Sequence, residues 1–226
     1  MLQAVIFDFD GVITDSEVLH LRAFNGVLAQ HGIEITTRNY YKDYLGLTDL
    51  DCFKLLASKG LLEPGDKGIE NLTEQKKYLF EELIKTEGRL IEGVRDFLAM
   101  LKQNSIPMAI CSGALLAEIE LILQEARLRS FFEVIVSAEQ VKNSKPSPEP
   151  FLLTLQKLNR NRKTPIGANE CVVIEDSHWG LEAAKAAGMH TIAVTNSYDA
   201  EQLAPAEKIV TQLSELSTGD LQKLCS

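Results

Sequence analysis

The sequence lacks the features that mark secreted disulfide-rich proteins and membrane proteins. Its four cysteines, Cys52, Cys111, Cys171 and Cys225, are widely scattered, with no CxxC pair and no histidines at zinc-ligand spacing. The N-terminal residues form no basic segment, and no apolar run approaches the roughly 18 residues that span a bilayer. We therefore expect reduced thiols in a cytoplasmic protein, with no structural zinc.

Nucleotide-binding signatures and an excess of basic residues are also missing. Neither GxxxxGK[ST] nor GxGxxG occurs, which removes the P-loop and dinucleotide signals. Lys and Arg number 23 against 32 Asp and Glu, so the formal net charge is -9. This charge repels nucleic-acid backbones and anionic membranes, so we expect a small-molecule partner and leave monomer and homodimer open. An anionic ligand would need a local cation or a metal.

Short apolar runs alternate with helical patterns along most of the chain. At 226 residues and 45% hydrophobic composition, the chain can form one α/β domain with a smaller insert. The runs at 3–8, 107–111, 134–136, 171–174 and 191–194 read as buried strands, and helical faces lie at 97–101, 119–123 and 181–187. This alternation predicts an α/β fold with a doubly wound, mainly parallel Rossmann-like sheet.

Residues 17–87 interrupt the alternation because they contain amphipathic helical patterns and no convincing strand. Leu21, Phe24 and Leu28 recur at helical spacing, and further helices are expected near 53–56 and 78–84, with a turn at 64–68. We predict an α-helical insert at 17–87 in a catalytic core formed by 1–16 and 88–226.

Polar residues follow the predicted strands where each strand ends. In open parallel sheets, ligands bind at this edge. Carboxylates, a hydroxyl and a lysine are the groups that magnesium-assisted phosphoryl transfer requires. In chain order they are Asp8 and Asp10, Ser112 and Gly113, Lys145, and Glu175 and Asp176.

The Asp8-Phe9-Asp10-Gly11 segment supports the most specific hypothesis about the site. Alternate residues leaving a strand point the same way, so Asp8 and Asp10 can face one site. A shared Mg²⁺ would offset the repulsion between an attacking carboxylate and a phosphate, and the second carboxyl could serve as acid and base. Gly11 allows a sharp turn with backbone N–H groups close to a phosphate.

Each of these features also has an ordinary structural interpretation when it is taken alone. An aspartate pair after a strand can form an Asx turn, and Ser112-Gly113 can mark a simple turn. Lys145 can be a solvated charge, and Glu175-Asp176 can begin a helix. Their order at successive strand ends is what favours a functional site.

The sequence resembles the haloacid dehalogenase-like hydrolase superfamily. Four motifs in the expected order carry the resemblance across nearly the whole chain. They are Asp-Phe-Asp-Gly-Val-Ile-Thr-Asp-Ser from Asp8, Ile-Cys-Ser-Gly ending at Gly113, Ser-Lys-Pro-Ser-Pro-Glu around Lys145, and Val-Val-Ile-Glu-Asp-Ser ending at Ser177. The insert matches, by position, the helical cap of the branch similar to β-phosphoglucomutases and phosphoglycolate phosphatases.

The resemblance implies a role for each matched residue. Asp8 would become a transient aspartyl phosphate, and Asp10 would be the general acid and base. Asp176 would hold Mg²⁺ together with Asp8 and the Asp10 carbonyl, with Glu175 assisting. Ser112 and Lys145 would bind phosphoryl oxygens.

The insert would then determine the leaving-group preference. Candidate contacts are His20, Gly46, Thr48 and Lys76, although His20 could be a surface residue and Lys76 a solvated neighbour of Lys77. Mutases of the resembled branch carry a cap arginine after a glycine, whereas the stretch from Gly46 to Asp49 has no cation. This departure weakens a mutase interpretation, while His20 and Lys76 keep it open.

Three hypotheses follow in order of preference. The first is a Mg²⁺-dependent phosphatase that hydrolyses a small phosphomonoester, such as a sugar phosphate, through phosphorylated Asp8. The second is a hexose phosphomutase similar to β-phosphoglucomutase. The third is a non-catalytic phosphorylatable signalling domain, although Asp10 and the long insert would then be superfluous.

Overall fold

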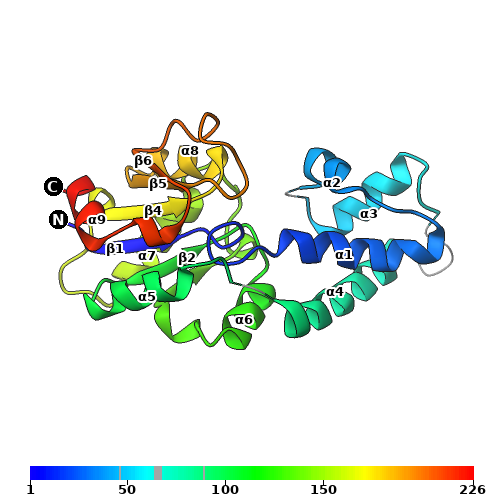
Figure 1. The fold of residues 1–226 in the computed structure, drawn as a ribbon, viewed down its shortest axis with the longest axis horizontal. Helices are drawn as coiled ribbons and strands as arrows, with labels where there is room; N and C mark the ends of the chain where they lie inside the picture. Colours follow the sequence, from blue (N-terminus) through cyan, green and yellow to red (C-terminus); the bar gives the residue numbers. More distant parts are fainter. Residues whose placement is uncertain (46, 64–67, 89) are drawn as a thin grey trace. The chain divides into compact units, whose positions relative to one another are not determined.

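The chain folds into two compact units, seen in a computed structural model that describes residues 1–45, 47–63, 68–88 and 90–226 (Figure 1). The first unit contains Met1–Asp15 and Arg89–Ser226, and the second contains Ser16–Gly88. We call them the α/β unit and the helical unit. The boundaries predicted from the sequence lie one residue away from these at each junction.

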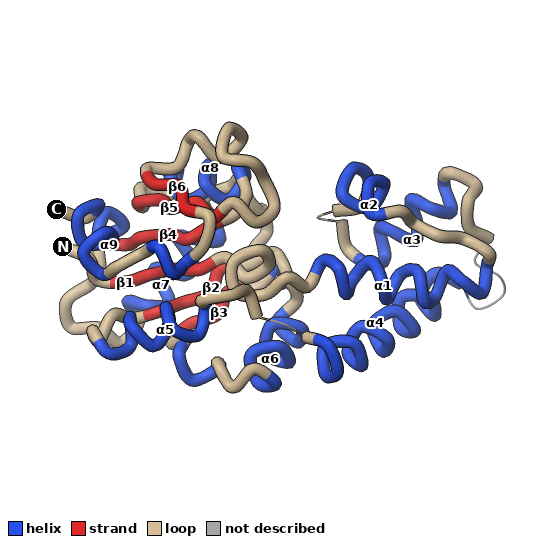
Figure 2. The backbone as a smooth tube through the Cα atoms, in the orientation of Figure 1, coloured by secondary structure: helices blue, strands red, loops and turns tan. Residues whose placement is uncertain are grey.

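The α/β unit is built on a six-stranded parallel sheet. Its strands have the spatial order β3-β2-β1-β4-β5-β6, and each neighbouring pair is parallel (Figure 2). The strands are β1 (Ala4–Phe7), β2 (Met108–Cys111), β3 (Val134–Val136), β4 (Cys171–Glu175), β5 (His190–Val194) and β6 (Lys208–Val210). The predicted α/β fold with a parallel sheet is therefore confirmed.

Helices cover both faces of this sheet, which explains why its central strands are apolar throughout. Helices α7 (Glu149–Asn159) and α8 (His178–Ala186) pack against the face that includes Ala4 and Ile6. Helix α5 (Val94–Gln103) covers the opposite face (Figure 2). There the Phe97 ring meets the Phe7 ring at 6.0 Å between centroids. The unit is completed by α6 (Leu116–Glu125) and α9 (Thr218–Leu224).

The helical unit contains four α-helices and no strand within its described residues. They are α1 (Glu17–Leu28), α2 (Thr37–Asp43), α3 (Asp49–Ser58) and α4 (Gly68–Glu87). Their core is apolar and partly aromatic, and the rings of Phe24 and Phe53 meet at 5.2 Å. The turn predicted at 64–68 lies outside the described residues except for Gly68. Among the helices of the described residues, none is long and apolar enough to cross a membrane.

Each unit fastens one loop to a helix through an asparagine side chain. In the α/β unit, Asn159 accepts from the backbone N–H of Ile166 at 2.7 Å and donates to its carbonyl at 2.9 Å. In the helical unit, Asn25 makes the same pair of bonds with Ile35, at 2.8 and 2.9 Å. In each unit, the paired bonds satisfy the N–H and the carbonyl of an isoleucine that is buried in the core.

We predict that Asn159→Ala lowers the free energy of unfolding by about 1–3 kcal/mol, because it leaves two partly buried backbone groups without their partner. Urea unfolding would measure the change. Asn104→Ala is the matched control, since the exposed Asn104 side chain makes a single bond to the Met100 carbonyl. Equal losses in the two variants would contradict the prediction.

Candidate active site

The sheet order places three functional strand ends next to one another. Strand β1 lies between β2 and β4, and Phe7 is in register with both Ile110 and Ile174. The residues that follow these positions therefore meet at one edge of the sheet. Asp8 follows β1, and Ser112 follows β2. Glu175 ends β4, and Asp176 follows it. All four are buried polar residues.

Lys145 joins this group from the loop before α7. Its Nζ donates to Asp8 Oδ1 at 2.5 Å, to Glu175 Oε1 at 2.7 Å and to the Cys111 carbonyl at 3.0 Å. Burial alone would lower the pKa of the Lys145 ammonium, but attraction to the two carboxylates outweighs burial and raises it well above its usual value. Lys145 is thus a fixed cation, and the interpretation as a solvated charge is wrong.

Three buried carboxylates can hold a metal ion. Asp8, Glu175 and Asp176 each offer one oxygen, and these oxygens lie within 4.8 Å of one another. Hard divalent cations prefer such oxygen ligands. Burial raises the pKa of Asp8 to about 8 despite Lys145, and burial with repulsion from Asp8 and Glu175 raises the pKa of Asp176. The donor set therefore fits a divalent cation, which would relieve this repulsion.

The Glu175 carboxylate is held in place by several donors. Oε2 accepts from the backbone N–H of Asp176 at 3.0 Å, and from the backbone N–H and hydroxyl of Ser177 at 2.9 and 2.8 Å. The carboxylate also fills the space where a side chain at Gly180 would begin. This packing explains why a glycine stands in the first turn of α8, and it links Glu175 to the start of that helix.

The Asp10-Gly11 turn is closed by backbone bonds. Gly11 has φ +80°, a left-handed conformation that favours glycine, and its N–H donates to the Thr14 carbonyl at 2.8 Å. A Cβ on Gly11 would overlap the Asp176 carboxylate. Glycine is therefore required here both for the turn and for the close approach of Asp176.

Ser112 and Gly113 lie beside the acidic cluster with different degrees of exposure. Ser112 is buried, and its Oγ accepts from the Ala114 N–H at 2.9 Å, which leaves the hydroxyl proton to donate. Gly113 is exposed, and no atom lies where its side chain would be. Space therefore does not require a glycine at this position.

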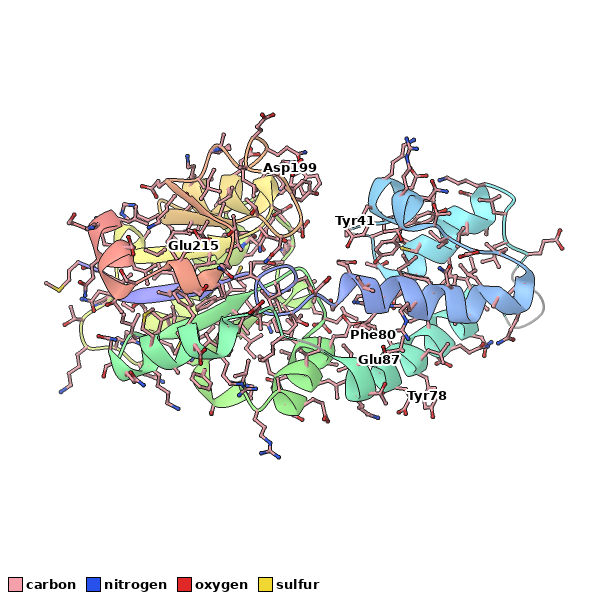
Figure 3. All side chains as sticks on the ribbon, viewed as in Figure 1. Tyr41, Tyr78, Phe80, Glu87, Asp199 and Glu215 are labelled. Atoms are coloured by element: carbon pink, nitrogen blue, oxygen red, sulfur yellow. The ribbon has the colours of Figure 1, made fainter. Side chains whose placement is uncertain are left out.

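Two residues at this edge were missed by the sequence analysis. The hydroxyl of Ser197 donates to Asp176 Oδ2, and the Asn196 side-chain amide donates to the Gly11 carbonyl at 2.7 Å. Both belong to the loop between β5 and β6, which also contains Asp199 (Figure 3). Both residues directly follow the strand predicted at 191–194. The expectation that polar residues after a strand form the site therefore applies to them as well.

The helical unit contains a polar cluster around a fully buried lysine. The fully buried Lys76 places its Nζ 2.6 Å from His20 Nδ1 and 2.7 Å from Asp49 Oδ1. The His20 ring stacks on Phe80 of α4 at 3.9 Å between centroids. Burial, followed by the charge of Lys76, keeps the pKa of His20 well below its usual value. The interpretation of Lys76 as solvated is therefore wrong, whereas His20 is half-buried, with its ring held between Lys76 and Phe80.

The other two candidates in the helical unit have different outcomes. Thr48 is the N-cap of α3: its Oγ1 accepts from the Asp51 N–H at 3.1 Å and donates to Asp51 Oδ2 at 2.8 Å. This capping accounts for a threonine there without any ligand. Gly46 lies outside the described residues.

We predict that the metal-free protein loses stability as the pH rises from about 4 to about 8. An acid whose pKa is raised in the folded state binds more protons there than in the unfolded chain, so ionisation of Asp8 over this window weakens folding. The melting temperature in a chelator should fall across the window, and Mg²⁺ should raise it more at pH 8 than at pH 5. Asp8→Asn should weaken both trends, and unchanged trends would contradict the prediction.

Comparisons with known proteins found a matching family and similar chains. The model of the haloacid dehalogenase-like hydrolase family matches residues 5–194. A phosphorylated carbohydrates phosphatase of Thermotoga maritima is 34% identical over 195 residues, which cover 84% of each chain, and hexitol phosphatase B of Escherichia coli is 32% identical over 96% of each. The crystal structure of CbbY from Rhodobacter sphaeroides with phosphate superposes with a TM-score of 0.85 at 26% identity, covering 98% of this chain and all of that one. The chain therefore belongs to the haloacid dehalogenase-like hydrolase family.

Proposed function

We propose that this protein is a Mg²⁺-dependent phosphatase that hydrolyses a small phosphomonoester through a phosphorylated Asp8. The observation that carries the proposal is the fixed contact between Lys145 and Asp8 inside a cluster of carboxylates able to hold a metal. A divalent cation bound in this cluster, together with Lys145, would keep the Asp8 carboxylate ionised, so that it could attack a phosphate. Family membership supports the same chemistry.

In the first half of the reaction, an Asp8 oxygen forms a bond to phosphorus while the bond from phosphorus to the ester oxygen breaks. Asp10 gives a proton to the departing oxygen, so the leaving group departs as an alcohol. In the second half, a water oxygen forms a bond to the phosphorus of the aspartyl phosphate while the bond from phosphorus to the Asp8 oxygen breaks, and the water gives a proton to Asp10. Inorganic phosphate leaves, and Asp8 and Asp10 return to their starting states.

Other residues at the sheet edge would bind the phosphoryl group and the metal. Lys145, the Ser112 hydroxyl and backbone N–H groups near Gly11 and Gly113 would bind phosphoryl oxygens. Mg²⁺ would be held by Asp8, Asp176 and the Asp10 carbonyl, with Glu175 assisting. When bound, it would screen the repulsion between the carboxylate and the phosphate.

The substrate class follows from the relatives and from the helical unit. Two relatives are phosphatases named for phosphorylated carbohydrates and for hexitols, so we propose a sugar phosphate or sugar-alcohol phosphate. Residues 17–87 would form a cap on a core of 1–16 and 88–226, with His20, Gly46, Thr48 and Lys76 as candidates for leaving-group contacts. The scattered free cysteines support a cytoplasmic location.

We predict that Asp8→Asn lowers phosphate release from sugar phosphates by roughly 10³-fold or more, because the amide cannot form the phosphorylated intermediate. A colorimetric phosphate assay over a panel of hexose, pentose and hexitol phosphates, with Mg²⁺ or with a chelator, would measure this. Metal-independent turnover would contradict the proposal. Isomerisation of β-glucose 1-phosphate without phosphate release would indicate a mutase, and stable phosphorylation without turnover a signalling domain.

We predict that Lys145→Ala lowers kcat by about 10²–10³-fold, because removal of one charged donor at the reacting group costs that much in comparable sites. Lys142→Ala is the matched control, since Lys142 lies three residues away with an exposed side chain. Single-turnover assays at saturating Mg²⁺ would compare the two variants. A Lys145→Ala enzyme as active as the control would remove Lys145 from the mechanism.

A further inference from the structure

We propose that Ser197 and Asn196 are positioning residues of the metal site, Ser197 by orienting the Asp176 carboxylate and Asn196 by fixing the turn at Gly11. The inference rests on the proposed function, because it assigns these residues to the cation that Asp8 and Asp176 would hold. Neither side chain is ionisable, and neither is given a role in the chemical steps above.

The Ser197 hydroxyl acts on one oxygen of a buried metal-ligand candidate. It donates to Asp176 Oδ2, and Asp176 is only 4% exposed. A donor fixed on one carboxylate oxygen sets the rotation of the whole group and hence the position of its second oxygen. Residues that hold metal ligands in this way contribute substantially to metal affinity without touching the ion.

Gly11 allows the loop after Asp8 to approach Asp176 Oδ2 closely. A Cβ on Gly11 would overlap Asp176 Oδ2 and would lie 3.0 Å from Ser197 Oγ. The serine hydroxyl, the aspartate oxygen and the glycine backbone are therefore packed together at one point. Asn196 adds a bond of 2.7 Å from its amide to the Gly11 carbonyl, which ties this turn to the same loop.

The loop that carries both residues is itself anchored to the sheet. Ala193 of β5 is in register with Glu175 of β4, so the residues after β5 leave the sheet beside Asp176. The Thr195 N–H donates to the Val210 carbonyl of β6 at 3.0 Å, and the Asn196 N–H donates to the Val194 carbonyl at 2.9 Å. Positioning groups built on strands hold a site more rigidly than groups on free loops.

The test is the affinity of the full chain for Mn²⁺ in the absence of substrate, followed by the EPR signal of the free ion, with Mg²⁺ as competitor. We expect Ser197→Ala to raise the Kd for both ions about 10-fold, and Asn196→Ala to raise it severalfold. Ser197→Thr keeps a hydroxyl and should stay within about twofold of the unmodified chain, which a purely steric role of Ser197 would not produce.

Ser217→Ala is the matched control. The Ser217 hydroxyl also donates to an aspartate oxygen, Asp220 Oδ2 at 2.5 Å, but it caps α9, and Asp220 pairs with Lys208 outside the cluster of Asp8, Glu175 and Asp176. This variant should leave both Kd values unchanged. Circular dichroism and melting temperature would show that each variant is folded.

Unchanged metal affinity in folded Ser197→Ala and Asn196→Ala would overturn the positioning role while leaving the phosphatase proposal intact. If Ser197→Ala does not fold, Asn196→Ala and Ser197→Thr decide the question by the same measurement. Failure of the unmodified chain to bind either ion would overturn both the inference and the metal dependence of the proposed function.

Discussion

The buried ion pair between Lys145 and Asp8 is the interaction on which the site depends. Three carboxylates and one ammonium lie buried at one edge of the sheet, so the group carries two net negative charges if all are ionised. Isolated buried charges are costly, and breaking a buried pair leaves an uncompensated charge. Lys145 contacts both Asp8 and Glu175, and through them it connects the ends of β1 and β4.

The sheet topology makes this arrangement possible. Asp8 and Lys145 are 137 residues apart in sequence. Because β1 lies between β2 and β4 in the sheet, the loop that carries Lys145 can reach both Asp8 and Glu175. The apolar strands fix the register, because a one-residue slip would move Phe7 off Phe97 and Phe132. The hydrophobic core thereby sets the positions of the polar site.

The sequence predicted the features that depend on local pattern. Five strands follow from apolar runs, and the gathering of Asp8, Ser112 and Asp176 follows from the rule on strand ends. Strand β6 was missed because it has only three residues and is partly exposed, and α7 was missed because the polar Thr154 interrupts its buried face between Phe151 and Leu158. The roles of the site residues stay predictions.

Other features could not be read from the sequence because they depend on partners distant along the chain. Lys76 is adjacent to Lys77, which is exposed, and nothing local distinguishes the two. Only the fold reveals that Lys76 pairs with Asp49 and with His20, 56 residues away. Position 180 likewise requires a glycine because the Glu175 carboxylate occupies the space of a side chain there. Helix propensity does not predict this contact.

Protonation and cation binding are two competing ways to neutralise the same acidic cluster. Without a metal, burial raises the pKa of Asp8 to about 8, and a protonated Asp8 is a poor nucleophile. A divalent cation would supply the two positive charges that the cluster lacks and would favour the ionised form. In a chain with a net charge of -9, this local compensation is what would allow an anionic phosphate to approach. The cation would therefore keep Asp8 ionised and lower the repulsion of an anion through the same electrostatic effect.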